Sequence, residues 1–91
     1  MSKKIIVISA TWCPSCLILK KHLKKIKSEF NDIEIEQLDY DFDEDIVSSY
    51  NVGDKLPVII CNENRLIGEK SYDEIILFLK ENNIIWKNYF I

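Results

Sequence analysis

Residues 5–16 read Ile-Ile-Val-Ile-Ser-Ala-Thr-Trp-Cys-Pro-Ser-Cys, and this stretch decides the fold. The four consecutive apolar residues at 5–8 are typical of a strand that is covered on both faces. A short loop over residues 10–12 follows, and then Pro14, which suits the first position of a helix because its missing N–H has no partner there. The stretch therefore predicts a strand over residues 3–9 that leads through the first cysteine into a helix.

The helix that begins at Pro14 is expected to extend to about residue 30. Its apolar side chains recur at alternating steps of three and four residues, so they form one buried stripe, made of Cys16, Leu19, Leu23, Ile26 and Phe30. Lysines fill the opposite side of the helix. This pattern predicts an amphipathic helix that packs against the strand before it.

The rest of the chain predicts five further elements. They are a strand over residues 33–38, a short helix over 43–50 that an acid caps, strands over 56–61 and 65–67, and a helix from 71 to 82. The last helix has a capping box, in which Ser71 caps the helix and Glu74 reaches back to its backbone N–H. The first strand–helix–strand unit implies a parallel pair with a right-handed crossover. The sequence thus predicts an α/β fold, βαβ-α-ββα, with a four-stranded mixed sheet flanked by helices.

Length and composition indicate one small domain over residues 1–91. Apolar residues make up 47% of the chain and charged residues 30%, and the net charge of −3 gives no reason to expect a nucleic-acid partner. The apolar run at 5–8 is too short for a membrane span or a signal peptide, so we expect a cytoplasmic protein. The apolar residues 84–91 are expected to fold back onto the core, which would leave a monomer. The alternative for that segment is a dimer or partner contact.

Charge is distributed unevenly along the chain. Five lysines lie between Lys20 and Lys27, whereas residues 31–54 contain nine acidic residues and no basic one. Such runs usually form solvated faces that attract each other weakly. The alternative is a docking surface for a charged partner.

Cys13 and Cys16 are spaced so that their sulfurs can meet at the start of a helix. Cys13 takes the N-cap position, where unpaired backbone N–H groups and the positive end of the helix dipole favour a thiolate, the nucleophilic form of cysteine. Cys16 lies one turn deeper, at the head of the buried stripe, so it should be shielded and less ionised. A dithiol catalyst needs this asymmetry, because one thiolate attacks a disulfide and the second thiol resolves the mixed disulfide.

Zinc is the alternative for a Cys-x-x-Cys pair, but zinc needs two further ligands. The other soft candidates are His22 and Cys61. His22 is about half a turn out of phase with Cys13 and should point into solvent, and Cys61 should be a small core residue at the end of a strand. We therefore predict no metal site within one chain. Two chains that share a metal or an iron–sulfur cluster through Cys13 remain an alternative.

The placement of the two cysteines between an apolar strand and an amphipathic helix resembles the thioredoxin/glutaredoxin superfamily. The likeness covers nearly the whole chain and rests on three features: residues 10–16, residues 56–59 (Leu-Pro-Val-Ile) and Gly68 before the last helix. It implies a thiol–disulfide oxidoreductase that acts on protein disulfides, with no cofactor beyond its own Cys13–Cys16 disulfide. A thioredoxin reductase-like or glutathione-based system would recycle it. A dedicated redox donor for one partner is the narrower alternative.

The resemblance also implies roles for the residues around the cysteines. Trp12, Pro14 and Ser15 would support the active site, with Trp12 shielding the thiolate and contacting the partner. A cis-Pro57 would face the cysteines and hold an extended substrate, together with Leu56, Val58 and Gly68.

The chain matches neither branch of the superfamily fully. Its size and its Cys-Pro-Ser-Cys sequence resemble glutaredoxin, whereas Trp12 and Leu56 look more like thioredoxin. After Gly68, only Ser71 and Asp73 could imitate glutaredoxin's contacts to glutathione. Thioredoxins carry a buried aspartate and a paired lysine at the positions of Val7 and Gln37, so we expect slower resolution or a shifted redox potential here.

Overall fold

A computed structural model describes residues 3–53 and 55–85. The elements follow the predicted order and are β1 (Lys4–Ser9), α1 (Pro14–Glu29), β2 (Glu34–Asp39), α2 (Glu44–Ser48), β3 (Val58–Cys61), β4 (Asn64–Ile67) and α3 (Tyr72–Glu81). They build one four-stranded sheet with strand order β2-β1-β3-β4. The predicted α/β class with a mixed sheet is confirmed.

The pairing of the strands also follows the prediction. β1 and β2 are parallel, in a register that runs from Lys4 opposite Glu34 to Ser9 opposite Asp39. β3 is antiparallel to β1 and forms a hairpin with β4. Because β1 and β3 occupy the centre of the sheet, the end of β1 that leads into the two cysteines lies beside the start of β3.

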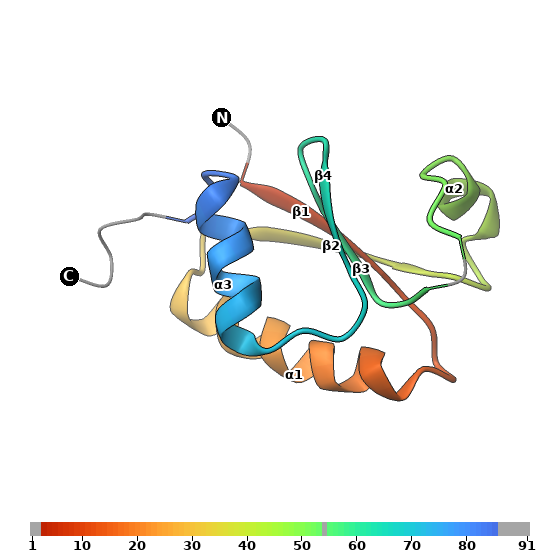
Figure 1. Cartoon of the computed structure of the whole chain (residues 1–91), viewed down its shortest axis with the longest axis horizontal. Helices are drawn as coiled ribbons and strands as arrows, with labels where there is room; N and C mark the ends of the chain where they lie inside the picture. The colour runs from red at the N-terminus through yellow and green to blue at the C-terminus, as the bar shows by residue number, and fades with distance from the viewer. Residues whose placement is uncertain (1–2, 54, 86–91) are drawn as a thin grey trace.

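Helices cover both faces of the sheet, with α1 and α3 on one side and α2 on the other (Figure 1). Ile5 and Val7 of β1 join the larger core cluster beneath α1 and α3, whereas Ile8 joins the smaller cluster with Val47 of α2. A strand with a core on each side needs apolar residues at successive positions, which explains the unbroken run at 5–8. Among the described residues, no helix has the length and apolar character that crossing a membrane requires.

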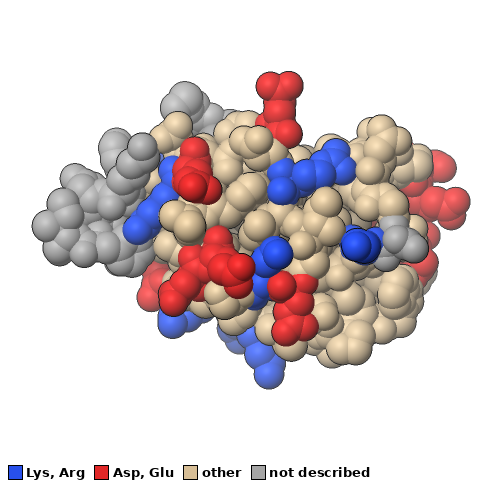
Figure 2. All heavy atoms as spheres, in the orientation of Figure 1, with Lys and Arg blue, Asp and Glu red and all other residues tan. Residues whose placement is uncertain are grey.

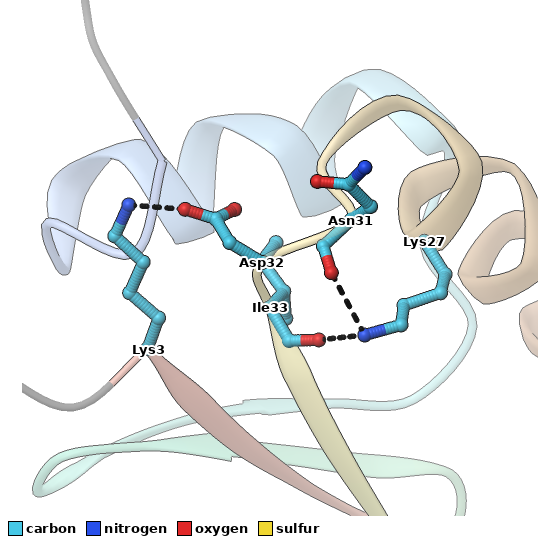
Figure 3. A network of polar contacts seen from close by, with 5 residues as sticks. All are labelled: Lys3, Lys27, Asn31, Asp32 and Ile33. Carbon is cyan, nitrogen blue, oxygen red and sulfur yellow. Dashed lines mark hydrogen bonds and ion pairs between the residues drawn. The ribbon is translucent and has the colours of Figure 1, made fainter.

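A small polar network joins the start of β1 to the loop between α1 and β2 (Figure 3). The Lys27 Nζ, in the last turn of α1, donates to the carbonyl oxygens of Asn31, at 3.2 Å, and of Ile33. Lys3 and Asp32 form an ion pair at 2.5 Å, and the hydrogen bond from Lys3 lowers the pKa of Asp32. The network holds the end of the crossover beside β1, where the parallel pairing begins.

Two predicted boundaries are wrong near the acidic segment. Helix α2 covers only 44–48 rather than 43–50, and Asp43 makes no side-chain cap. Its carboxylate instead accepts a hydrogen bond from the backbone N–H of Asp39, at 2.8 Å. Strand β3 begins at Val58 rather than at residue 56, because the Leu56–Pro57 peptide bond is cis and a proline has no N–H for a ladder.

The end of α3 returns the chain to the core. Asn83 adopts a left-handed conformation with φ 59°. Its N–H donates a hydrogen bond to the carbonyl of Lys80, and the N–H of Ile84 donates one to the carbonyl of Leu79. These two hydrogen bonds form a Schellman motif. The turn places Ile84 and Ile85 in the larger core cluster. The first two residues of the apolar segment 84–91 therefore pack inward, and the other six lie outside the described residues.

Replacing Ile84 with alanine should lower the free energy of unfolding by about 2–4 kcal/mol, because the side chain is buried in the main cluster. Urea denaturation followed by circular dichroism measures this loss. The matched control is Leu77→Ala on α3, whose side chain is 55% exposed, and it should cost less than about 0.5 kcal/mol. Equal losses in the two variants would contradict a structural role for the turn after α3.

Candidate active site

Cys13 takes the N-cap position of α1, as predicted. Its backbone is extended (φ −100°, ψ 110°), and its Sγ accepts a hydrogen bond from the backbone N–H of Cys16 at 3.2 Å. Pro14 follows as the first helical residue. The sulfur of Cys13 thus occupies the place where a helix start offers unpaired N–H groups and partial positive charge.

The two sulfurs lie in a small apolar cluster of their own. It contains Ala10, Cys13 and Cys16, with Tyr40 and Leu56 packed against it. Cys16 is 0% exposed and Cys13 is 6% exposed. The predicted shielding of Cys16 is therefore confirmed, and Cys13 is also largely covered by neighbouring side chains.

Burial raises the pKa of Cys16 to about 11, and its hydrogen bond with Cys13 acts in the same direction. The backbone of Ala10 and the charge of Lys20 oppose this rise. At neutral pH, Cys16 is therefore a protonated thiol. It has to lose that proton before it can act as a nucleophile.

Trp12 lies at the edge of the site and is 60% exposed. Its indole N–H donates to Asp41 Oδ2 at 2.7 Å. Its ring meets that of Tyr40 edge to face, with 6.3 Å between the centroids. Trp12 therefore joins the cysteine motif to the loop between β2 and α2. The role of Asp41 has no local signal in the sequence, because Asp41 lies 29 residues from Trp12.

Ser15 makes a second connection from the motif. Its hydroxyl donates to Glu69 Oε1 at 2.8 Å, which joins the first turn of α1 to the loop before α3. Ser15 was predicted to support the site, but its partner Glu69 was not predicted. The two residues are 54 positions apart, and nothing in the local sequence pairs them.

The Leu56–Pro57 bond is cis, as the family resemblance implied. Leu56 contacts the cysteine cluster. The carbonyl of Pro57 accepts a hydrogen bond from the N–H of Gly68 at 2.8 Å, and Gly68 has a φ of 90° that favours glycine. The Val58 side chain is fully buried on the α2 side of the sheet. The contribution of these four residues to substrate binding remains a prediction.

The sheet register places Val7 opposite Gln37. Val7 is buried in the main core, and Gln37 is exposed on the edge strand. The two positions where the resemblance implied an aspartate and a lysine are thus neighbours, but neither residue present can take a proton from Cys16.

The other zinc candidates lie apart from the cysteine pair. Cys61 is fully buried in the larger core cluster, and burial raises its pKa to about 12. His22 is partly buried, with its ring 5.9 Å from that of Tyr72, so the expectation that it points into solvent is wrong. The described residues contain no group of three or more His, Cys, Asp or Glu that could hold a metal ion.

A family model described as Thioredoxin matches residues 1–81. The chain belongs to the thioredoxin family. No curated protein sequence matches the chain, but solved thioredoxin structures match it closely in shape.

Two of these structures cover most of the chain. Thioredoxin-2 of the malaria parasite, described as a component of its protein secretion machinery, has a TM-score of 0.77 at 21% identity, covering 86% of this chain and 81% of that one. Mitochondrial thioredoxin 3 from Saccharomyces cerevisiae, in its oxidised form, has a TM-score of 0.72 at 24% identity, covering 86% and 76%. At these identities the likeness shows the fold alone.

Limited alkylation of the reduced protein should label Cys13 before Cys16. At pH 7 both burial and its raised pKa hold Cys16 back, and below pH 11 its labelling rate should rise about tenfold per pH unit with the thiolate fraction. Iodoacetamide labelling followed by peptide mass spectrometry measures both rates. Labelling of Cys16 first at neutral pH would contradict the assigned asymmetry.

Proposed function

We propose that this thioredoxin reduces protein disulfides, with Cys13 as the attacking residue and Cys16 as the resolving residue. One observation carries the assignment. The sulfur of Cys13 caps α1 and Cys13 is 6% exposed, whereas Cys16 is fully buried and protonated one turn deeper. The two thiols therefore differ in access, and the deeper one stays protonated until the second step, as a sequential exchange requires.

The reaction proceeds in two exchange steps. The Cys13 thiolate attacks one sulfur of a target disulfide, the target S–S bond breaks, and the released target thiolate takes a proton. Cys16 then loses its proton and attacks the sulfur of Cys13, which releases the second target thiol. The target gains two electrons and two protons, and the protein is left with a Cys13–Cys16 disulfide.

An extended segment of the target would lie along the cis-Pro57 loop. Leu56 is the side chain of this loop that contacts the cysteine cluster, so it would contact residues next to the target cysteine. The exchange needs no cofactor beyond the two thiols. A thioredoxin reductase-like or glutathione-based system would restore the dithiol, and a reducing compartment such as the cytoplasm would keep it available. We propose that the protein works as a monomer.

Trapping tests the two assigned roles. In a Cys61→Ala background, a Cys16→Ser variant should retain a disulfide substrate as a stable mixed disulfide through Cys13, because nothing resolves it. A Cys13→Ser variant should retain none. Non-reducing electrophoresis and mass spectrometry with native, disulfide-linked insulin as substrate measure the adducts. An equal yield of adducts from the two variants would reverse or remove the assignment of the attacking thiol.

The resolving step should depend strongly on pH. Because the pKa of Cys16 is raised to about 11 and neither Val7 nor Gln37 can accept its proton, the rate of resolution should increase about tenfold per unit between pH 7 and 9. Rapid acid quenching of the wild-type reaction followed by mass spectrometry gives the lifetime of the mixed disulfide. A lifetime that does not change with pH would indicate an internal base.

The narrower alternative, a redox donor dedicated to one partner, makes a different prediction for the same assay. Such a donor would leave insulin unreduced and still form an adduct with its own partner. The alternative of a metal or cluster shared by two chains would give purified protein that contains metal and elutes as a dimer. No contact among the described residues favours either alternative.

A further inference from the structure

Two carboxylates flank the attacking cysteine, one on each side. Asp41 accepts a hydrogen bond from the indole of Trp12 at 2.7 Å, and Glu69 accepts one from the hydroxyl of Ser15 at 2.8 Å. Trp12 and Ser15 stand immediately around the Cys13-Pro14 pair in the chain. Each hydrogen bond therefore fixes a negative charge at the rim of the site, and the two charges come from loops on different sides of the motif.

Within the described part of the chain, neither Asp41 nor Glu69 forms an ion pair. The salt bridges among residues 3–53 and 55–85 are those of Lys3 with Asp32 and of Lys4 with Glu34 and Glu36. Asp41 and Glu69 are both exposed, so their charges reach solvent where a substrate would approach.

The basic residues near the motif form no ion pair with Asp41 or Glu69 among the residues that the structure describes. Lys20 acts on the buried Cys16. Hydrogen bonds from Ser71 lower the pKa of Glu74, and Lys70 adds to this lowering, so its charge lies beside Glu74. Lys55, next to Leu56, is an exposed cation.

The surface beyond Asp41 is acidic as well. A cavity of about 540 Å³ between the β2–α2 loop and the segment after α2 is lined by Asp41 and Glu44, together with Tyr40 and Val47. Figure 2 shows acidic atoms gathered at the end of the molecule where α2 lies. A substrate that extends from Cys13 over Trp12 therefore meets negative charge along its path.

We propose that Asp41 and Glu69 make the site select its substrates by charge. The site then prefers disulfides flanked by lysine or arginine and disfavours anionic disulfides such as that of glutathione. This inference rests on the proposed function. Fixed charges beside a reacting group raise the encounter rate of partners of opposite sign and lower that of partners of like sign. Asp41 is hydrogen-bonded to Trp12 and Glu69 to Ser15, and both of these residues lie within two positions of Cys13. Both charges therefore act close to the sulfur that a substrate has to reach.

The exchange chemistry is the same for every substrate. The Cys13 thiolate attacks a probe sulfur, the probe S–S bond breaks, and the departing thiolate is protonated. Cys16 then displaces the second half of the probe and forms the Cys13–Cys16 disulfide. Only the charge two carbons away from the probe sulfur has to differ for a test of the proposal.

Three small disulfides of matched length provide that test. Cystamine is cationic, bis(2-hydroxyethyl) disulfide is neutral and 3,3′-dithiodipropionate is anionic. Their rates with the reduced protein are measured by acid quenching and divided by their rates with 2-mercaptoethanol, which corrects for intrinsic reactivity. At low ionic strength, cystamine should react about tenfold faster than dithiodipropionate after this correction, and 0.5 M salt should reduce the ratio to about twofold.

The variant Asp41→Asn with Glu69→Gln keeps both hydrogen-bond acceptors and removes both charges. It should lower the ratio of the cationic to the anionic probe to about twofold at low salt, with each rate expressed relative to that of the neutral probe. The matched control is Glu63→Gln at the turn between β3 and β4, at the end of the sheet away from Cys13. It removes one acidic charge from the surface and should leave the ratio unchanged.

The outcomes separate this inference from the proposed function. Equal corrected rates for the two charged probes would overturn the charge selection. So would a fall in the ratio with Glu63→Gln as large as that with the Asp41→Asn/Glu69→Gln variant. In either case, Cys13-dependent reduction of the neutral probe would still support the oxidoreductase. No Cys13-dependent reduction of the neutral probe would remove the proposed function, and the charge selection with it.

Discussion

The hydrogen bond from the backbone N–H of Cys16 to the sulfur of Cys13 fixes the start of α1, and the arrangement of the site depends on that start. A helix has a defined phase once its first turn is set. With Cys13 as the cap, Cys16 falls at the head of the apolar stripe and is buried. Trp12 and Ser15, which flank the Cys13-Pro14 pair, turn toward the loops that bear Asp41 and Glu69. Moving the helix start by one residue would rotate each of these side chains by about 100°.

The sheet supplies the complementary constraint. β1 is central and has a core on each face, so its end cannot move without disturbing both clusters. The start of β3 is held beside it by antiparallel pairing, with Val58 opposite Ile8. The cysteines after β1 and the cis-Pro57 before β3 are therefore brought together by the two best-buried strands. The loops that bear Asp41 and Glu69 are joined to this rigid centre through Trp12 and Ser15, and also through the hydrogen bonds from Tyr40 N–H to Ser9 and from Gly68 N–H to Pro57.

Sequence reasoning succeeded where the signal is local. The apolar run at 5–8, the stripe along α1 and the Cys-Pro-Ser-Cys spacing each reflect a periodicity or a cap that neighbouring residues define, and the element order follows from them. The cis-Pro57 was inferred from family resemblance, since proline permits a cis bond without requiring it. Asp41 and Glu69 were not identified, because their partners are far away in sequence and an exposed acid carries no local mark of its role. Asp43 was expected to cap α2, and this was wrong. Its carboxylate accepts a hydrogen bond from an N–H in the preceding strand rather than from one in the helix.

The position of Cys61 limits how the protein can be oxidised. Three cysteines allow three intramolecular pairings, two of which would leave the molecule in an inactive state. Cys61 is fully buried at the end of β3 that adjoins the hairpin turn, whereas Pro57 and the two active thiols lie at the opposite end of that strand. The length of β3 separates the thiols, and burial keeps Cys61 protonated. Oxidation within the folded chain therefore favours the Cys13–Cys16 disulfide over the two pairings that involve Cys61.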